Sequence, residues 1–92
     1  RGILESFAEQ SAANCRLLER ALESGDVAAL RAVAHKMLPI FTMLGAAGVA
    51  ATLRTAESWE GPLTDALCGE IGAAAENIRA IVAEAQKKVS LP

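Results

Sequence analysis

The spacing of apolar residues along this chain, one every three or four positions, is the feature that most constrains its fold. The last third of the sequence shows this spacing at Leu67, Ile71, Ala74, Ile78, Ile81, Ala85 and Val89. It places the side chains on one face of an α-helix, whereas a half-buried strand would alternate apolar and polar residues. We therefore predict an amphipathic helix over about residues 64–89.

Three earlier segments repeat the pattern. Between about residues 3 and 23 the apolar face carries Leu4, Phe7, Ala8, Ser11, Cys15, Leu18 and Leu22. Between about residues 26 and 44 it carries Val27, Leu30, Ala34, Met37, Phe41 and Leu44, and between about 46 and 60 it carries Val49, Leu53 and Ala56. We predict that the four faces pack together as one core.

Residues that end or begin helices lie between these segments. The breaks fall at Gly25, Gly45 and Gly61-Pro62. Asp26 suits the N-cap of the second helix, and Thr64 or Asp65 can cap the last. Links of only a few residues make consecutive helices antiparallel neighbours. We therefore predict an all-α, up-down-up-down four-helix bundle that forms a single domain over residues 1–92.

The composition agrees with closely packed helices. The chain has 92 residues, enough for one core, and 20 of them are alanine. Alanine is the best helix former and fills little volume, so it lets helices approach closely. An aromatic content of only 3% argues against a β-sandwich. The chain enters a helix almost at its first residue, from which we expect a domain cut from a longer protein.

Charge and cysteine content exclude several classes of function. A net charge of −2 gives no electrostatic footprint for nucleic acid or anionic lipid. Cys15 and Cys68 lack the spacing of metal ligands, and the chain has one histidine, so we expect no metal site and two reduced thiols. No apolar run approaches the roughly 18 residues of a membrane span, and we expect no signal peptide. We expect a cytoplasmic domain without direct membrane contact.

The second predicted helix has an unusual outward face. Opposite the buried stripe lie Ala28, Ala32, His35, Pro39 and Thr42, with Arg31 and Leu38 at the margin. An ordinary solvated face would carry Glu, Lys and Gln, whereas this one is small, nearly uncharged and centred on the single histidine. Such a surface suits a partner protein that must reach a side chain. Burial in an oligomer or in a longer parent chain, or a surface histidine without a role, would also explain it.

Pro39 adds a local conflict beside His35. A proline inside a helix removes one backbone hydrogen bond and clashes with the carbonyl four residues earlier, here that of His35, at a cost of ~3 kcal/mol. We expect a bend or loosened turn next to the histidine. Conflicts of this kind occur at functional sites, although a simple kink that fits the bundle is the alternative.

The residues of the second and third helices carry a family resemblance. They are Ala34-His35-Lys36-Met37-Leu38, then Met43-Leu44-Gly45-Ala46, then Leu53 and Ala56-Glu57. This arrangement resembles the histidine-containing phosphotransfer (HPt) domain, with its Ala-His-x-Leu-Lys-Gly, later Leu-Gly-Ala and closing Leu-Glu. Leu38-Pro39 stands where the family has Lys-Gly, which leaves open how closely a partner backbone can approach.

The resemblance implies a phosphorelay intermediate in two-component signal transduction, without kinase activity of its own. His35 would accept a phosphoryl group from a receiver-domain aspartate and donate it to another response regulator. Glu57 would accept a hydrogen bond from Nδ1–H and so orient the ring, and Lys36 would balance the phosphoryl charge. The receiver would supply Mg²⁺, so the domain needs no cofactor of its own. The expected docking residues are Ala28, Arg31, Ala32, Leu38, Pro39 and Thr42.

The same residues allow other interpretations. The sequence is equally compatible with Glu57 and Lys36 as ordinary surface residues. Arg31 is a candidate for a receiver or phosphate contact, weaker than Glu57 and Lys36. The chain could be a helical docking module that carries no phosphate. It could also be the dimerisation-and-phosphotransfer helix region of a sensor kinase, although Lys36 stands where that region has an acid. We expect a monomeric domain whose partners are receivers and a sensor kinase, in the same chain or in another. The parent chain that we expect is a hybrid sensor histidine kinase, of which this domain would be part of the cytoplasmic tail.

Overall fold

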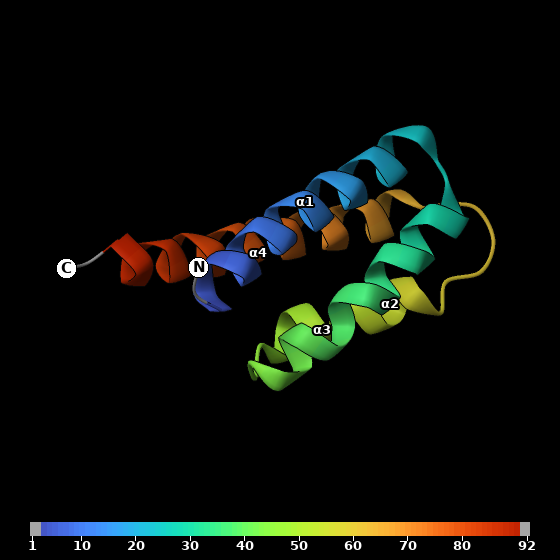
Figure 1. Ribbon diagram of the computed structural model, residues 1–92. Helices are drawn as coiled ribbons and strands as arrows, with labels where there is room; N and C mark the ends of the chain where they lie inside the picture. The colour runs from blue at the N-terminus through green and yellow to red at the C-terminus, as the bar shows by residue number, and fades with distance from the viewer. Residues whose placement is uncertain (1–2, 91–92) are drawn as a thin grey trace.

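The computed structural model describes residues 3–90, and the side chains of residues 6–87. Across this described part the chain is helical, with four helices joined by short links (Figure 1). The helices are α1 (Ile3–Ser24), α2 (Val27–Met43), α3 (Ala47–Glu57) and α4 (Asp65–Ser90). The prediction of an all-α chain built as a helical bundle is therefore confirmed.

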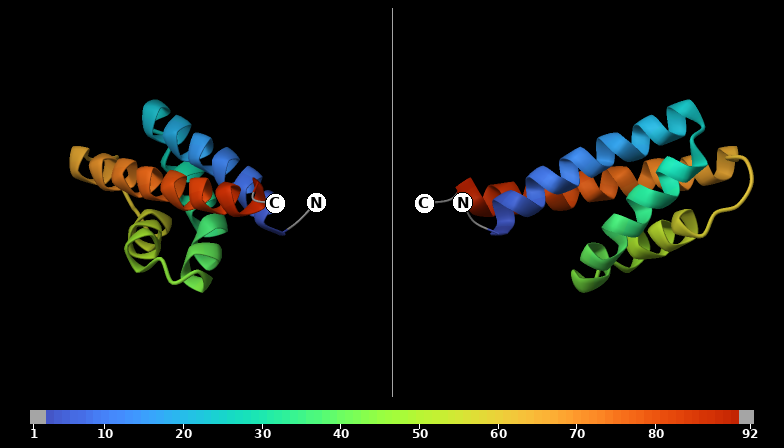
Figure 2. Two further views of the ribbon diagram at one scale, coloured as in Figure 1. Left: turned by 90° about the vertical axis from the view of Figure 1, so that its left-hand side faces the viewer. Right: turned by 45° about the vertical axis from the view of Figure 1, so that its right-hand side comes forward.

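The helices associate as two pairs. α1 and α4 lie side by side, and α2 and α3 form a second, shorter pair (Figures 1 and 2). α1 also packs against α2, and α3 packs against α4, so every helix has two neighbours. The molecule is elongated, 48 × 23 × 18 Å along its principal axes. This arrangement brings the end of α3 beside the middle of α2.

The links follow the predicted helix breakers. Gly25 and Gly45 have φ angles of +68° and +74°, in the left-handed region that glycine enters without steric cost. Asp26 caps α2, because its carboxylate accepts a hydrogen bond from the Ala29 N–H at 3.0 Å. Of the two candidates before α4, Thr64 is the cap, since its hydroxyl accepts from the Leu67 N–H at 3.1 Å.

The predicted apolar faces form one core between the helices. Its fully buried large side chains are Cys15, Leu18, Leu30, Met37, Phe41, Leu53, Leu67, Ile71 and Ile78. The rings of Phe7 and Phe41 meet at 6.0 Å between centroids and join α1 to α2. Because this stripe of α2 is held inward, the opposite face of the helix is held outward.

Two predictions about the second and third helices need correction. Leu44 was expected on the buried stripe, but 54% of its surface is exposed, because α2 ends at Met43 and the chain turns away at this C-cap residue. The third helix ends at Glu57 instead of about residue 60, because the N–H groups of Ser58 and Trp59 close its last turn. The side chains of Leu4 and Val89, both expected in the core, lie outside the described residues.

Two negative findings apply to the part of the chain that the structure describes. Within it, no helix is both long and apolar enough to cross a bilayer. Nor do three or more His, Cys, Asp or Glu side chains gather there as a metal ion would require.

Candidate functional site

His35 projects from the outward face of α2. Its side chain is 77% exposed, although the preceding residue, Ala34, is completely buried. Helical geometry explains the contrast, because consecutive residues are turned by about 100° around the axis. The core therefore fixes the direction of His35 without covering its ring.

The ring of His35 is held by a carboxylate from the next helix. Its Nδ1 is hydrogen-bonded to Oε1 of Glu57, the last residue of α3. Ala56 is buried against the core, which places Glu57 at the edge of α3 that faces α2, with its side chain 30% exposed. The acid expected beside the histidine is thus in contact with it.

This contact assigns the two ring nitrogens. A carboxylate can only accept, so the proton of this hydrogen bond belongs to Nδ1 of His35. In a neutral imidazole the other nitrogen, Nε2, then carries the lone pair. Nε2 makes no hydrogen bond to any described residue, and the side chain that carries it is 77% exposed. The arrangement presents one nucleophilic nitrogen at the surface.

Arg31 makes a contact that the sequence did not suggest. Its Nε donates a hydrogen bond of 3.1 Å to the backbone carbonyl of Glu57. Arg31 lies one turn before His35, and both side chains reach the same residue of α3. The four-residue spacing places Arg31 and His35 on one face of α2, but the contact also depends on where α3 ends, which the apolar spacing did not give.

The other predicted site residues surround His35 at various depths. Those that are exposed are Ala28, Arg31, Ala32, Lys36, Pro39 and Thr42. Leu38 is half-buried and packs against the core. α2 continues as an α-helix past Pro39 to Met43. The exposed set has mostly small side chains and includes two basic residues, Arg31 and Lys36.

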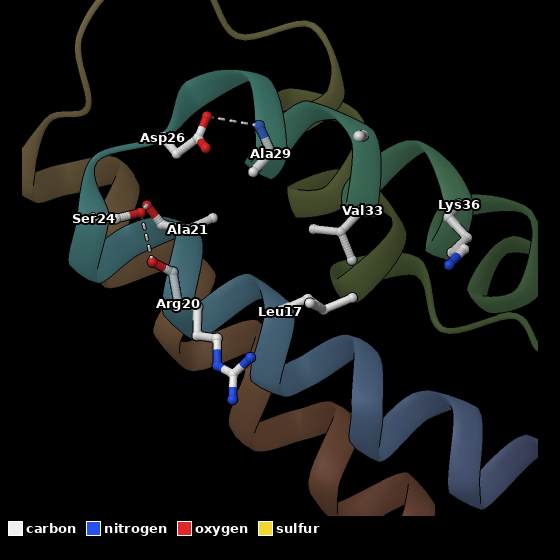
Figure 3. Close-up of a pocket in the computed structure, with 9 residues that line it drawn as sticks. Leu17, Arg20, Ala21, Ser24, Asp26, Ala29, Val33 and Lys36 are labelled. Atoms are coloured by element: carbon white, nitrogen blue, oxygen red, sulfur yellow. Dashed lines mark hydrogen bonds between the residues drawn. The ribbon is translucent and has the colours of Figure 1, made fainter.

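A shallow groove adjoins this face on the side away from Glu57. It lies between α1 and α2, and its lining residues are Leu17, Arg20, Ala21, Ser24, Asp26, Ala29, Ala32, Val33 and Lys36. Leu17 and Val33 point toward one another across it (Figure 3). Ala32 and Lys36 belong both to the groove and to the surroundings of His35. His35 therefore has the Glu57 carboxylate on one side, and its neighbours Ala32 and Lys36 border the groove on the other.

Fold and site together define a small helical domain that presents a single oriented imidazole to solvent. Comparison with known families agrees with the resemblance found in the sequence. The sequence model of the family described as Hpt domain matches residues 2–81, so the chain belongs to the Hpt domain family. No curated protein and no solved structure matched the chain. Membership of this family implies a part in phosphorelay within two-component signalling, with response-regulator receiver domains as partners.

Proposed function

We propose that this domain is a phosphorelay intermediate in which His35 accepts a phosphoryl group from a receiver aspartate and donates it to another response regulator. The observation that supports this proposal is that the His35 ring is both exposed to solvent and fixed in orientation. Its side chain is 77% exposed, and Nδ1 is engaged by Glu57. A nucleophile in phosphoryl transfer needs an accessible lone pair held in one orientation, and this arrangement supplies both.

The proposed step moves the phosphoryl group from an aspartyl oxygen of the receiver to Nε2 of His35. The lone pair of Nε2 forms a bond to phosphorus while the bond from phosphorus to the aspartyl oxygen breaks, and the electron pair leaves with the aspartate as a carboxylate. The ring keeps its Nδ1 proton and gains positive charge. The Glu57 carboxylate, hydrogen-bonded to Nδ1–H, stabilises that charge. Donation to the next receiver is the same step in reverse.

Most of the charge stabilisation in this reaction is assigned to the partner. Phosphoryl transfer depends on positioning and on groups that neutralise the phosphoryl oxygens. We assign Mg²⁺ to the receiver and no cofactor to this domain. We assign Lys36, which is exposed and adjacent in sequence to His35, to balance phosphoryl charge on this chain.

The same face serves as the docking surface in this proposal. Small side chains such as Ala28, Ala32 and Thr42 allow a partner backbone to approach, and the groove beside them offers apolar contact. We propose that the four helices follow one another in up-down-up-down order. We further propose that the domain is monomeric, lies in the cytoplasm, and works with a sensor kinase in the same chain or in another.

Phosphorylation in solution tests the proposal. Incubated with a phosphorylated cognate receiver, the domain should gain phosphate that is labile in acid and stable in alkali. The His35→Gln variant should gain none, because glutamine has no nucleophilic ring nitrogen. Circular dichroism of the variant serves as the folding control. Equal labelling of native protein and variant would refute the assignment.

A further inference from the structure

The C-terminus of α3 is closed by a residue from another helix. The last four carbonyls of an α-helix lack partners within it and need others. Those of residues 54–56 accept hydrogen bonds from Ser58 or Trp59, directly beyond the helix. The carbonyl of Glu57 instead accepts from Nε of Arg31 at 3.1 Å, across the boundary to α2.

Two side chains of α2 therefore make hydrogen bonds to Glu57. Arg31 binds its backbone carbonyl, and His35 binds its carboxylate. Helix ends fray unless their polar groups are satisfied, and fraying at Glu57 would move the carboxylate away from the ring. A guanidinium at this position also places positive charge at the negative end of the helix dipole. Both effects keep the Glu57 carboxylate within hydrogen-bonding distance of Nδ1 of His35.

We propose that Arg31 is a positioning residue for phosphoryl transfer. It fixes the end of α3, so that Glu57 holds the proton on Nδ1 of His35 and leaves Nε2 with its lone pair. This assignment rests on the proposed function of His35. It differs from a docking role for Arg31, because it acts on the ring of the free domain, before any receiver has bound.

Substitution of Arg31, read by NMR and by kinetics, tests the assignment. Arg31→Met removes the donor and the charge but keeps a side chain of similar length, whereas Arg31→Lys keeps a charged donor. Arg16→Met is the matched control, since Arg16 is an exposed arginine at a pocket between α1 and α4. The ¹⁵N shifts of the His35 ring, at a pH where it is neutral, report which nitrogen carries the proton. Single-turnover transfer from a phosphorylated receiver reports the rate.

The expected result is a coupled change. Arg31→Met should shift the ring from the Nδ1–H form to a mixture with the Nε2–H form, and should slow transfer by about tenfold. Arg31→Lys should restore part of the Nδ1–H form and part of the transfer rate. Arg16→Met should change neither the tautomer nor the rate. An unchanged tautomer in Arg31→Met overturns the assignment even if receiver affinity falls, since that result indicates docking alone. A shifted tautomer with an unchanged rate overturns it as well.

The two arms separate this inference from the proposed function. If native protein takes no phosphate from any receiver, the proposed function fails. The tautomer measurement needs no receiver, so it still supports or refutes the chain of contacts from Arg31 through Glu57 to His35.

Discussion

At the scale of single residues, the hydrogen bond between Nδ1–H of His35 and the Glu57 carboxylate determines which ring nitrogen carries the proton and which keeps a lone pair. The two groups come from different helices, and neither is buried in the core. Glu57 does not touch the phosphoryl group in the proposed step. Its effect on the rate therefore depends on orientation and on charge.

Glu57→Ala should slow phosphoryl transfer without abolishing it, by up to about a hundredfold, because the ring loses its fixed orientation and tautomer. Glu57→Gln separates the two contributions, since its amide oxygen still accepts from Nδ1–H but carries no charge. Its rate should fall between those of native protein and Glu57→Ala. Rapid-quench measurement of transfer from a phosphorylated receiver gives the rates. A native rate in Glu57→Ala would contradict the role given to this carboxylate.

The pairing of His35 with Glu57 was predictable because both residues lie in a recognisable pattern of residue types. The contact of Arg31 with the Glu57 carbonyl was not. This contact depends on where α3 ends, and the apolar spacing predicted a helix that continues to about residue 60. Local hydrogen bonds at Ser58 and Trp59 set the true end, and no apolar pattern records them.

At the scale of helices, α2 carries the site and also an internal proline. Pro39 has no N–H, so the carbonyl of His35 loses its usual helical donor. The helix nevertheless continues to Met43, since the buried stripe around Met37 and Phe41 holds it against the bundle. Packing has overridden local propensity here.

Pro39→Ala should stabilise the domain, because it restores the missing hydrogen bond and removes the clash with the His35 carbonyl. The free energy of unfolding should rise by about 1–3 kcal/mol, and the Tm by several degrees. Thr42→Ala, at another exposed position of α2, should change it by less than about 0.5 kcal/mol. Thermal unfolding followed by circular dichroism measures both. A lower Tm in Pro39→Ala would show that the proline fits α2 better than alanine.

Cys15 on α1 links stability to pH. Burial raises the pKa of the Cys15 thiol, despite the opposing effect of the Arg79 guanidinium. The unfolded chain therefore loses this proton at lower pH than the folded chain does. Stability from the buried neutral thiol is complete below about pH 8.5 and falls as the pH rises toward the raised pKa. Urea unfolding from about pH 7 to about pH 9.5 should show a steeper loss in native protein than in Cys15→Ala. Equal slopes would contradict the prediction.

At the scale of the whole molecule, the pairing of helices sets what surrounds His35. α3 supplies the carboxylate on one side, and α1 supplies Leu17 and Arg20 to the groove on the other. The apolar spacing was enough to predict four helices and most of their buried faces. It failed at Leu44, because a spacing rule assumes that the helix continues, whereas the chain turns there.

Ala32→Glu tests whether the face around His35 docks the receiver. The substitution places bulk and negative charge at the border of the groove, where the proposed partner brings an acidic site. We expect the Kd for the receiver to rise by tenfold or more, about 1.4 kcal/mol of binding free energy. Ala80→Glu, on the exposed face of α4, should leave the Kd unchanged. Calorimetry with a cognate receiver provides the comparison, and equal Kd values for the two variants would place docking elsewhere.

The most direct test of the central claim is the position of phosphorus on the ring. The domain, labelled with ¹⁵N and phosphorylated by a receiver, can be examined by ³¹P and ¹⁵N NMR, which identify the nitrogen bonded to phosphorus. The contact of Nδ1 with Glu57 predicts phosphorus on Nε2 of His35, with the proton retained on Nδ1. Phosphorus on Nδ1, or on any residue other than His35, would contradict the account.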